Sequence, residues 1–272
     1  MLYKPTLGQI ATGAYRNHPR YDGCVGHWLM NEGGGLTAYN ISGYFNNGTL
    51  TGGPTWTGGQ FGYALSLDGV DDYVTAGTPA LFDLSNGTVT LWYNCASNVN
   101  DMGLFGKDNA GANDGDFSVR IRQSDDATNP NKIQISSVLG SADTLSSVAA
   151  APFNIWTFLA IAFGSGGKRI YISGVLDSSN ANTTGMTNAT ADLIIGSQRP
   201  NVDPFSGRLD DVRIYNRALL GSEIASLYTD PFVEFHAAPK VRYFFVATDP
   251  QNPGFGNKIW TPHLVGGGGL SA

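Results

Sequence analysis

The chain has 272 residues, of which 42% are hydrophobic and 14% charged, with a formal net charge of −6. This hydrophobic fraction is enough for a sizeable core and excludes a largely disordered chain. No apolar run approaches the roughly 20 residues of a membrane-spanning helix, and the acidic balance argues against nucleic-acid binding. The first residues lack an apolar secretory segment, so we expect no routing by that pathway.

Residues 1–22 follow neither the helical nor the strand period, and we interpret them as an N-terminal arm. Short strand-like segments separated by turn residues then follow, at 25–30, 61–76 as a hairpin, 89–93, 103–107, 117–122, 132–139, 155–163, 168–174, 191–196 and 208–215. In 117–122, Phe117, Val119 and Ile121 alternate with Ser118, Arg120 and Arg122. The series predicts an all-β, two-sheet antiparallel sandwich of jelly-roll type over residues 23–231.

The stretch 208–228 changes period part-way. Asp210, Val212 and Ile214 alternate as on one face of a strand, and a short helix is expected from an N-cap at Ser222. If the face of Val212 and Ile214 is the core, the Asp210 carboxylate points inward. It then needs backbone donors, a cation or water.

Four stretches carry a family resemblance. The run RLDDVRIYNRALLGSEIASLY (208–228) resembles the closing motif of laminin G-like domains of the concanavalin A-like lectin/glucanase group. VGHWLMNEGGG (25–35), SGYFNNGTL (42–50) and FGYALSLDGVDDYV (61–74) resemble the group's opening strand, the turn after it and the following hairpin, in the same order. The resemblance implies a jelly-roll sandwich, and a family consisting mostly of binding modules and spacers.

The same resemblance implies a structural calcium ion that joins the opening turn to the closing strand. The matching positions are Asn31, Glu32, Asn40 and Asp210, with Asn at 40 where relatives commonly have Asp. If such an ion is held, chelation should lower the melting temperature. The alternative, an Asp210 carboxylate satisfied by backbone amides, stays open. A turn and a metal site both stay open for Asp68, Asp71 and Asp72.

Catalytic motifs are missing from the sequence. Glucanases that resemble this fold use a Glu-x-Asp-x-Glu strand, and retaining hydrolysis needs two carboxyl groups about 5 Å apart. The chain has three glutamates, Glu32, Glu223 and Glu234, and no two are close in sequence. No Gly-x-Ser-x-Gly elbow or phosphate loop is present. We therefore expect a protein that is not an enzyme.

Aromatic side chains suggest binding surfaces. Trp56 and Tyr93 are candidate glycan platforms, whereas Trp92 and Trp156 are expected in the core. The two cysteines, Cys24 and Cys95, are expected to be free thiols.

Residues 232–272 are rich in aromatics and prolines and predict a C-terminal arm that docks on a partner. The candidate docking residues are Phe235, Tyr243, Phe244, Phe245, Phe255 and Trp260. The resulting hypothesis is a virion surface or assembly protein, of the capsid decoration, head fibre or tail adhesin type, that displays its sandwich, forms oligomers and can bind a glycan. A free-standing or cell-surface carbohydrate-binding module is the alternative, and a glycoside hydrolase is less favoured.

Overall fold

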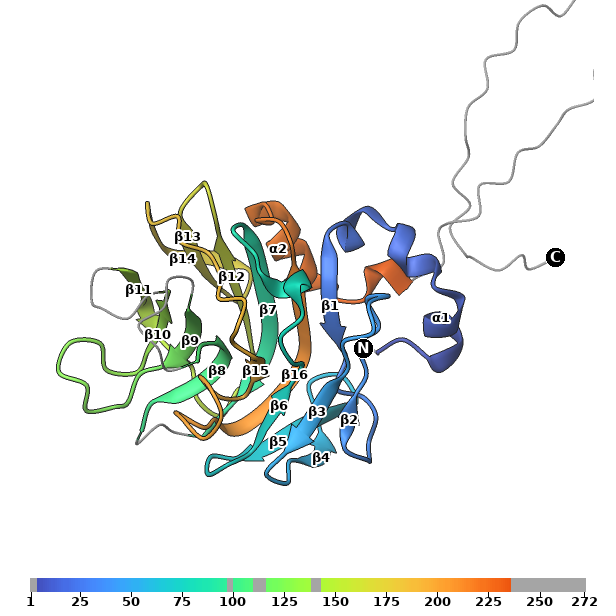
Figure 1. Cartoon of the computed structure of the whole chain (residues 1–272), viewed down its shortest axis with the longest axis horizontal. Helices are drawn as coiled ribbons and strands as arrows, with labels where there is room; N and C mark the ends of the chain where they lie inside the picture. The colour runs from blue at the N-terminus through green and yellow to red at the C-terminus, as the bar shows by residue number, and fades with distance from the viewer. Residues whose placement is uncertain (1–3, 97–99, 110–115, 138–142, 236–272) are drawn as a thin grey trace, which may run out of the picture.

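Two antiparallel β-sheets packed face to face form the body of the computed structural model, which describes residues 4–96, 100–109, 116–137 and 143–235 (Figure 1). The first sheet runs β14 (Val175–Asn180), β13 (Lys168–Ile172), β12 (Thr157–Phe163), β7 (Gly87–Asn94), β16 (Ser206–Tyr215), β5 (Tyr63–Asp68) and β4 (Thr55–Gly58), with β1 (Cys24–Trp28) also paired to β16. The second runs β11 (Thr144–Ala150), β10 (Lys132–Ser136), β9 (Phe117–Ile121), β8 (Met102–Lys107), β15 (Leu193–Ile195), β6 (Tyr73–Thr75), β3 (Gly48–Thr51) and β2 (Thr37–Ala38). The predicted two-sheet sandwich is confirmed.

The core lies between the sheets and follows the period-2 pattern of the strands. In β9, Phe117, Val119 and Ile121 enter the core, so the residues between them face outward. The strand β12 lies between β7 and β13 and every one of its residues is buried, as its two apolar faces predict. Within the described residues, no helix is both long and apolar enough to span a membrane.

A second apolar layer covers the outer face of the first sheet. Trp92, Phe158 and Tyr215 point into it, and the helix α2 (Gly221–Thr229) contributes Ile224 and Leu227. The N-terminal residues join this layer as α1 (Leu7–Thr12), η1 (Ala14–Asn17) and η2 (Pro19–Tyr21). Arg20 of η2 bonds Ser226 O of α2, whereas α1 lies on the far side of β1 from α2 (Figure 1). Two further short helices are η3 (Ala80–Phe82) and η5 (Val233–Phe235).

The expected N-terminal arm is therefore wrong for residues 4–22. Tyr15 and Tyr21 are buried, and the Tyr15 ring packs 4.4 Å from that of Phe235. The helices here are only three to six residues long, too short to show a period in the sequence, and this is why the pattern did not reveal them. The sandwich with its outer layer extends from Lys4 to Phe235, beyond the predicted limits of 23 and 231.

The strand β16 contains a β-bulge that the alternation does not predict. The register shifts between Asp210 and Arg213, and Asp211 has a left-handed backbone with φ 45°, a conformation that Asp tolerates better than most residues. The extra residue moves Asp210 out of phase with Val212. Leu209, not Asp210, shares the core face with Val212 and Ile214.

The segment 61–76 is not a hairpin. Its first strand, β5, pairs with β4 and β16, whereas its second, β6, pairs with β3 and β15 in the other sheet. The turn at Asp68 to Asp72 therefore carries the chain from one sheet to the other. Asp72 Oδ2 accepts from Asp68 N (3.0 Å) and Asp68 Oδ1 accepts from Val70 N (2.8 Å), so two of these carboxylates hold the turn.

The helix α2 starts two residues earlier than expected from an N-cap at Ser222. Its N-cap is Leu220, whose backbone N–H donates to Glu223 Oε2 (2.8 Å). The same carboxylate group pairs with Arg217, so Glu223 satisfies a helix donor and anchors the preceding turn.

Candidate functional site

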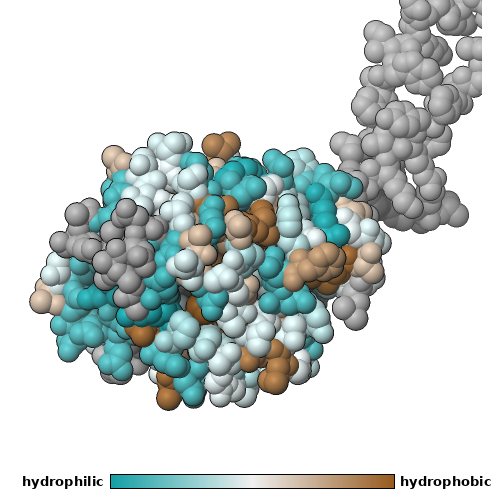
Figure 2. Space-filling view, viewed as in Figure 1, coloured by the Kyte–Doolittle hydropathy of each residue, from teal (hydrophilic) through white to brown (hydrophobic). Residues whose placement is uncertain are grey.

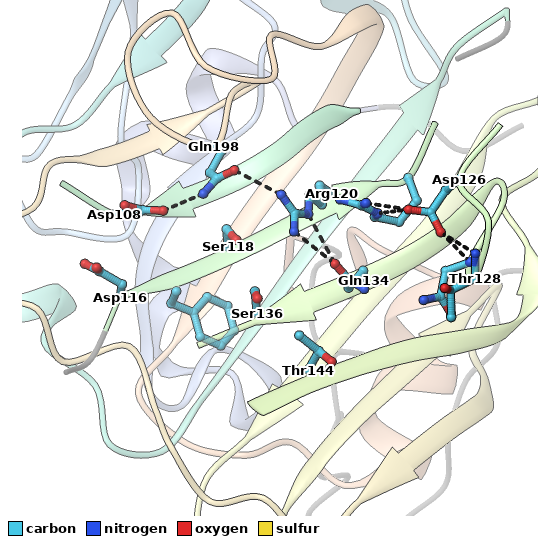
Figure 3. A pocket seen from close by; sticks show the side chains of 13 residues that line it. Asp108, Asp116, Ser118, Arg120, Asp126, Thr128, Gln134, Ser136, Thr144 and Gln198 are labelled. Atoms are coloured by element: carbon cyan, nitrogen blue, oxygen red, sulfur yellow. Dashed lines mark hydrogen bonds and ion pairs between the residues drawn. The ribbon is translucent and has the colours of Figure 1, made fainter. Parts of the chain in front are cut away.

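A polar cavity of about 630 Å³ lies on the outward face of β9, β10 and β11. We call it the polar cavity, and the residues that line it are Asp108, Asp116, Phe117, Ser118, Arg120, Arg122, Asp126, Thr128, Asn129, Gln134, Ser136, Thr144 and Gln198 (Figure 3). Figure 2 shows hydrophilic residues gathered over this end of the molecule. The outward positions of the alternating strand β9 form its floor.

Arg120 is the centre of the hydrogen-bond network in the polar cavity. It lies directly across from Gln134 in the β9–β10 register, and its Nη2 donates to Gln134 Oε1 (3.0 Å). Its Nη1 also lies 3.3 Å from Asp203 Oδ2. Gln134 Nε2 in turn donates to Ser146 Oγ on β11 (3.3 Å). The network fixes the positions of the Arg120 and Gln134 side chains.

Two glycines in β8 bring Gln198 to the polar cavity. A Cβ at Gly103 would lie 2.2 Å from Gln198 N, and one at Gly106 would lie 1.7 Å from Gln198 O. Only glycine lets the loop after β15 lie directly on the strand. Gln198 Nε2 then donates to Asp108 Oδ2 (2.5 Å), and Gln198 Oε1 accepts from Arg120 Nη1 (3.4 Å) (Figure 3).

The charges of the polar cavity are mixed, and both of its arginines are already paired. Arg122 bonds Asp101 and Asp126, and the hydrogen bond from Arg122 lowers the pKa of Asp126 to about 2. Asp126 is thus an ionised acceptor at neutral pH. Carboxylates, amides, hydroxyls and guanidinium groups together offer the donors and acceptors that sugar hydroxyl groups require.

Three of the four predicted metal ligands accept hydrogen bonds from the backbone. Asn31 Oδ1 accepts from Tyr63 N (3.3 Å), and Glu32 Oε1 accepts from Tyr39 N (2.7 Å). Asn40 Oδ1 accepts from the backbone N–H groups of His27 (2.9 Å) and Ser42 (3.0 Å). One oxygen of each of these three side chains thus accepts from the backbone, whereas Glu32 Oε2 is buried and has no hydrogen-bond partner among the described residues.

Asp210, the fourth predicted ligand, is fully buried and pairs with an ammonium group. Its Oδ1 lies 2.5 Å from Lys4 Nζ, and its Oδ2 accepts from the backbone N–H groups of Gln60 (3.0 Å) and Phe61 (3.2 Å). Calcium takes six to eight oxygen ligands, and here the carboxylate is committed to protein donors. The residues around Asp210 therefore do not fit a calcium ion.

The predicted glycan platforms lie away from the polar cavity. Tyr93 is fully buried in the core between the sheets, so it is not available to a ligand at the surface. Trp56 is half-buried on the edge strand β4, where its Nε1 donates to Gly35 O (3.0 Å). Trp92 is buried as expected, whereas Trp156 is only partly buried beside the outer layer. Both cysteines are buried free thiols, which confirms that prediction.

Of the predicted docking residues, only Phe235 is described, and it is buried against its own domain. Its ring contacts Tyr15, so it is not exposed to a partner. Tyr243, Phe244, Phe245, Phe255 and Trp260 lie outside the described residues.

A buried charged cluster sits under the outer layer, beside the bulge of β16. His27 Nε2 lies 2.8 Å from Asp211 Oδ1, and its Nδ1 lies 3.0 Å from Tyr21 Oη. Arg213 bonds Asp211 and also Glu234 Oε1 (2.6 Å). A neutral imidazole that donates from Nε2 and accepts at Nδ1 satisfies both of its contacts. The cluster ties the N-terminal segment and β1 to the end of the domain.

Acidification is expected to destabilise the domain through His27. Burial, assisted by Arg213, lowers the pKa of His27 to about 4 from 6.5. Between these values the unfolded chain binds a proton that the folded chain does not, so stability falls as the pH drops from 6.5 to 4. The loss from this residue is roughly 3 kcal/mol.

Urea unfolding between pH 7 and pH 4 measures this loss. His27→Gln removes the titrating group, so the natural chain should lose roughly 3 kcal/mol more than the variant over this range, although the variant starts from a lower stability. Burial raises the pKa of Asp210 to about 7 and also raises the pKa of Glu32 and of Glu234, and these three carboxyl groups act in the opposite sense in both proteins. Arg213 and His27 lower the pKa of Asp211 to about 2 despite its burial. Equal slopes for both proteins would contradict the assignment to His27.

Comparison with known proteins places this geometry in a family. The family model described as the concanavalin A-like lectin/glucanases superfamily matches residues 68–225, more than half of the chain. The chain belongs to this superfamily. Among curated proteins, no sequence matches the chain.

Several solved structures share this fold at low sequence identity. Domain 4 of AbnA, an extracellular GH43 arabinanase from Geobacillus stearothermophilus solved in complex with arabinotriose, matches with a TM-score of 0.60 and 22% identity, over 75% of this chain and 98% of that chain. The binding domain of Paraclostridial Mosquitocidal Protein 1 matches with a TM-score of 0.62 and 17% identity, over 79% of this chain and 53% of that chain. Trypanosoma rangeli sialidase matches with a TM-score of 0.58 and 14% identity, over 78% of this chain but only 33% of the sialidase chain.

The outward pattern of β9 was visible in the sequence, but it was not recognised as a site. Ser118, Arg120 and Arg122 alternate with core residues, and two charged positions on one strand face are a signal of a functional surface. Asp108 and Gln198 come from loops far apart in the sequence. Their meeting depends on the sheet order, which the sequence pattern does not reveal.

Proposed function

We propose that the chain is a non-catalytic glycan-binding domain that holds a neutral sugar chain in the polar cavity. The single observation that supports this most is the pre-ordered network around Arg120, Gln134 and Gln198 inside a cavity large enough for a few sugar units. Polar side chains fixed by their own neighbours bind a ligand with less loss of conformational entropy. The arabinanase domain solved with arabinotriose has the same fold and supports the ligand class.

The charge of the polar cavity favours neutral over acidic sugars. Three aspartates and two arginines line it, and both arginines are already paired with carboxylates, Arg120 with Asp203 and Arg122 with Asp101. An acidic sugar would have to displace one of these pairs and would meet the remaining carboxylates. A neutral sugar needs only to replace the hydrogen bonds that water makes with the side chains of the cavity.

The acids of the polar cavity support binding rather than hydrolysis. Glycoside hydrolysis requires a protonated carboxylic acid beside the leaving oxygen and a second carboxylate. Asp126 is held ionised by Arg122, and none of the three glutamates of the chain lines the cavity. We expect bound polysaccharide to remain intact, as a reducing-end assay of an overnight incubation would show.

A glycan array probed with the full chain tests the binding proposal. We expect binding to neutral glycans and not to sialylated ones. Arg120→Ala should weaken binding about tenfold or more, because a hydrogen bond to a charged group contributes about 1.5–3 kcal/mol. Ser136→Trp should block the cavity without removing a charge.

The control is Arg169→Ala, which removes an arginine of β13. Within the described part of the chain, the Arg169 side chain makes one hydrogen bond, from Nη2 to the nearby Gly166 O (2.7 Å). It should bind as the natural chain does. Circular dichroism should confirm that all three variants fold. Glycan binding that is equal in Arg120→Ala, Ser136→Trp and the control would refute the placement of the ligand in the polar cavity.

Attachment to a larger particle, with a virion surface as the expected setting, is a second proposal. Its support is the sequence after Phe235, where Tyr243, Phe244, Phe245, Phe255 and Trp260 stand among prolines. Such aromatics are typical of interface residues that bury against another subunit. A chain that ends at Phe235 is expected to keep glycan binding and to lose oligomers in sedimentation. Identical sedimentation of the two chains would count against this second proposal.

A further inference from the structure

The carboxylate of Asp210 is enclosed on all sides by the protein. The residue is fully buried, and the backbone N–H groups of Gln60 and Phe61 donate to Oδ2. A Cβ at Gly59 would lie 2.7 Å from the same oxygen, so a glycine at this position lets the loop between β4 and β5 close over the carboxylate. The other oxygen, Oδ1, faces the N-terminal segment.

The ammonium group of Lys4 fills the space in front of Oδ1. The Lys4 side chain is only 2% exposed, and Nζ lies 2.5 Å from Asp210 Oδ1. It also donates to Met30 O (3.1 Å) and to Tyr63 O. An ammonium group has three donors, and these three oxygens match them.

The backbone at Met30 is shaped for this contact. Met30 is buried and has a left-handed φ of 52°, an uncommon conformation for a residue with a side chain. Its carbonyl accepts from Lys4 Nζ. Backbone strain of this kind persists where surrounding contacts maintain it.

The three oxygens come from parts of the chain that are distant in sequence. Met30 follows β1, Tyr63 begins β5 and Asp210 lies in β16, so one cation joins three strands to the N-terminal segment. Carbonyl and carboxylate oxygens gathered around one point would otherwise suit a hard metal cation. Here the Lys4 ammonium group already occupies the point where these three oxygens meet, so a metal ion could bind there only if Lys4 moved away.

We infer that the ammonium group of Lys4 is the structural cation of this domain and takes the place of a metal ion between the opening turn and the closing strand. The domain then folds without calcium at Asp210. Residues 4–22 belong to the folded unit because their first described residue supplies this cation. The N-terminal segment thus has a structural function in the sandwich itself.

Thermal melting of the full chain tests the inference without any substitution. The melting temperature should be equal, within about 1 °C, in 1 mM CaCl2 and in excess EGTA, since a ligand that does not bind the native state does not stabilise it. Asp210→Asn, melted in the same two buffers, locates any calcium effect. A drop in EGTA that the natural chain shows and Asp210→Asn does not would overturn the inference.

Substitution of the lysine supplies the second test. Lys4→Met keeps the side-chain length and removes the charge, which leaves Asp210 buried without its cation, and should lower the melting temperature by roughly 5–15 °C. The control is Lys132→Met, because Lys132 Nζ bonds Val148 O at the exposed edge of the sheet. Its melting temperature should change by less than about 2 °C. A Lys4→Met protein that melts like Lys132→Met would overturn the inference.

A double variant shows whether the two charges act together. In Lys4→Met, the further change Asp210→Asn should cost little or restore stability, because the unpaired charge is removed. Additive losses would mean that the two residues act independently, and the inference would then be wrong.

Discussion

Arg213→Met is expected to lower the free energy of unfolding by about 3–5 kcal/mol. Arg213 is 1% exposed and bonds Asp211 in its own strand, Glu234 Oε1 (2.6 Å) and Pro231 O. Without the guanidinium group, the carboxylates of Asp211 and Glu234 stay buried with no positive charge between them. The loss comes mainly from these two stranded charges rather than from the bonds themselves.

Urea unfolding at pH 7 measures this change, and Arg208→Met is its matched control. Arg208 lies in the same strand and its Nη1 donates to Gly58 O (3.2 Å) at a half-exposed position. Its removal should cost under about 1 kcal/mol. Glu234→Gln should fall between the two, because an amide can still accept from Arg213. A stability of Arg213→Met equal to that of Arg208→Met would show that the buried cluster contributes nothing.

A chain that ends at Pro231 is expected to melt more than about 10 °C below one that ends at Phe235. The four residues between include Phe232, Glu234 and Phe235, all buried in the outer layer. Loss of a buried phenylalanine side chain costs about 3–5 kcal/mol, and 1 kcal/mol shifts the melting temperature by about 2–4 °C in a domain of this size. Phe232 packs edge-on against Phe61, with ring centroids 5.2 Å apart.

The chain that ends at Phe235 should melt close to the full chain. This comparison, followed by calorimetry, separates the folding role of residues 232–235 from any role of residues 236–272. If both shortened chains melt alike, the outer layer does not depend on its C-terminal residues. A drop already present in the chain that ends at Phe235 would extend the folded unit beyond the described residues.

The two-sheet fold was predictable because its signal is local. Alternation in β9 and the doubly apolar pattern of β12 each depend on a few neighbouring residues. The bulge at Asp211 was not predictable, because a left-handed φ at a residue other than glycine leaves no mark in the alternation of polar and apolar residues. The same holds for the turn at Asp68, whose residues suit a hairpin as well as a crossing between sheets.

The site residues divide in the same way. Asp210 was predictable as a buried acid that needs a partner, but its partner Lys4 is separated from it by almost the whole chain. Arg120 was visible on the outward face of β9, whereas Gln198 reaches it only because Gly103 and Gly106 admit a loop onto β8.

The amino-acid order alone determined the strand content, the sandwich class and the absence of a glucanase carboxylate motif, since each follows from the identity or spacing of nearby residues. Only the tertiary structure decided that residues 4–22 complete the domain, that Lys4 neutralises Asp210, and which side chains line the polar cavity. These depend on contacts between segments far apart in the sequence, and the free energy of such contacts comes from shared burial and charge pairing that no single segment shows by itself.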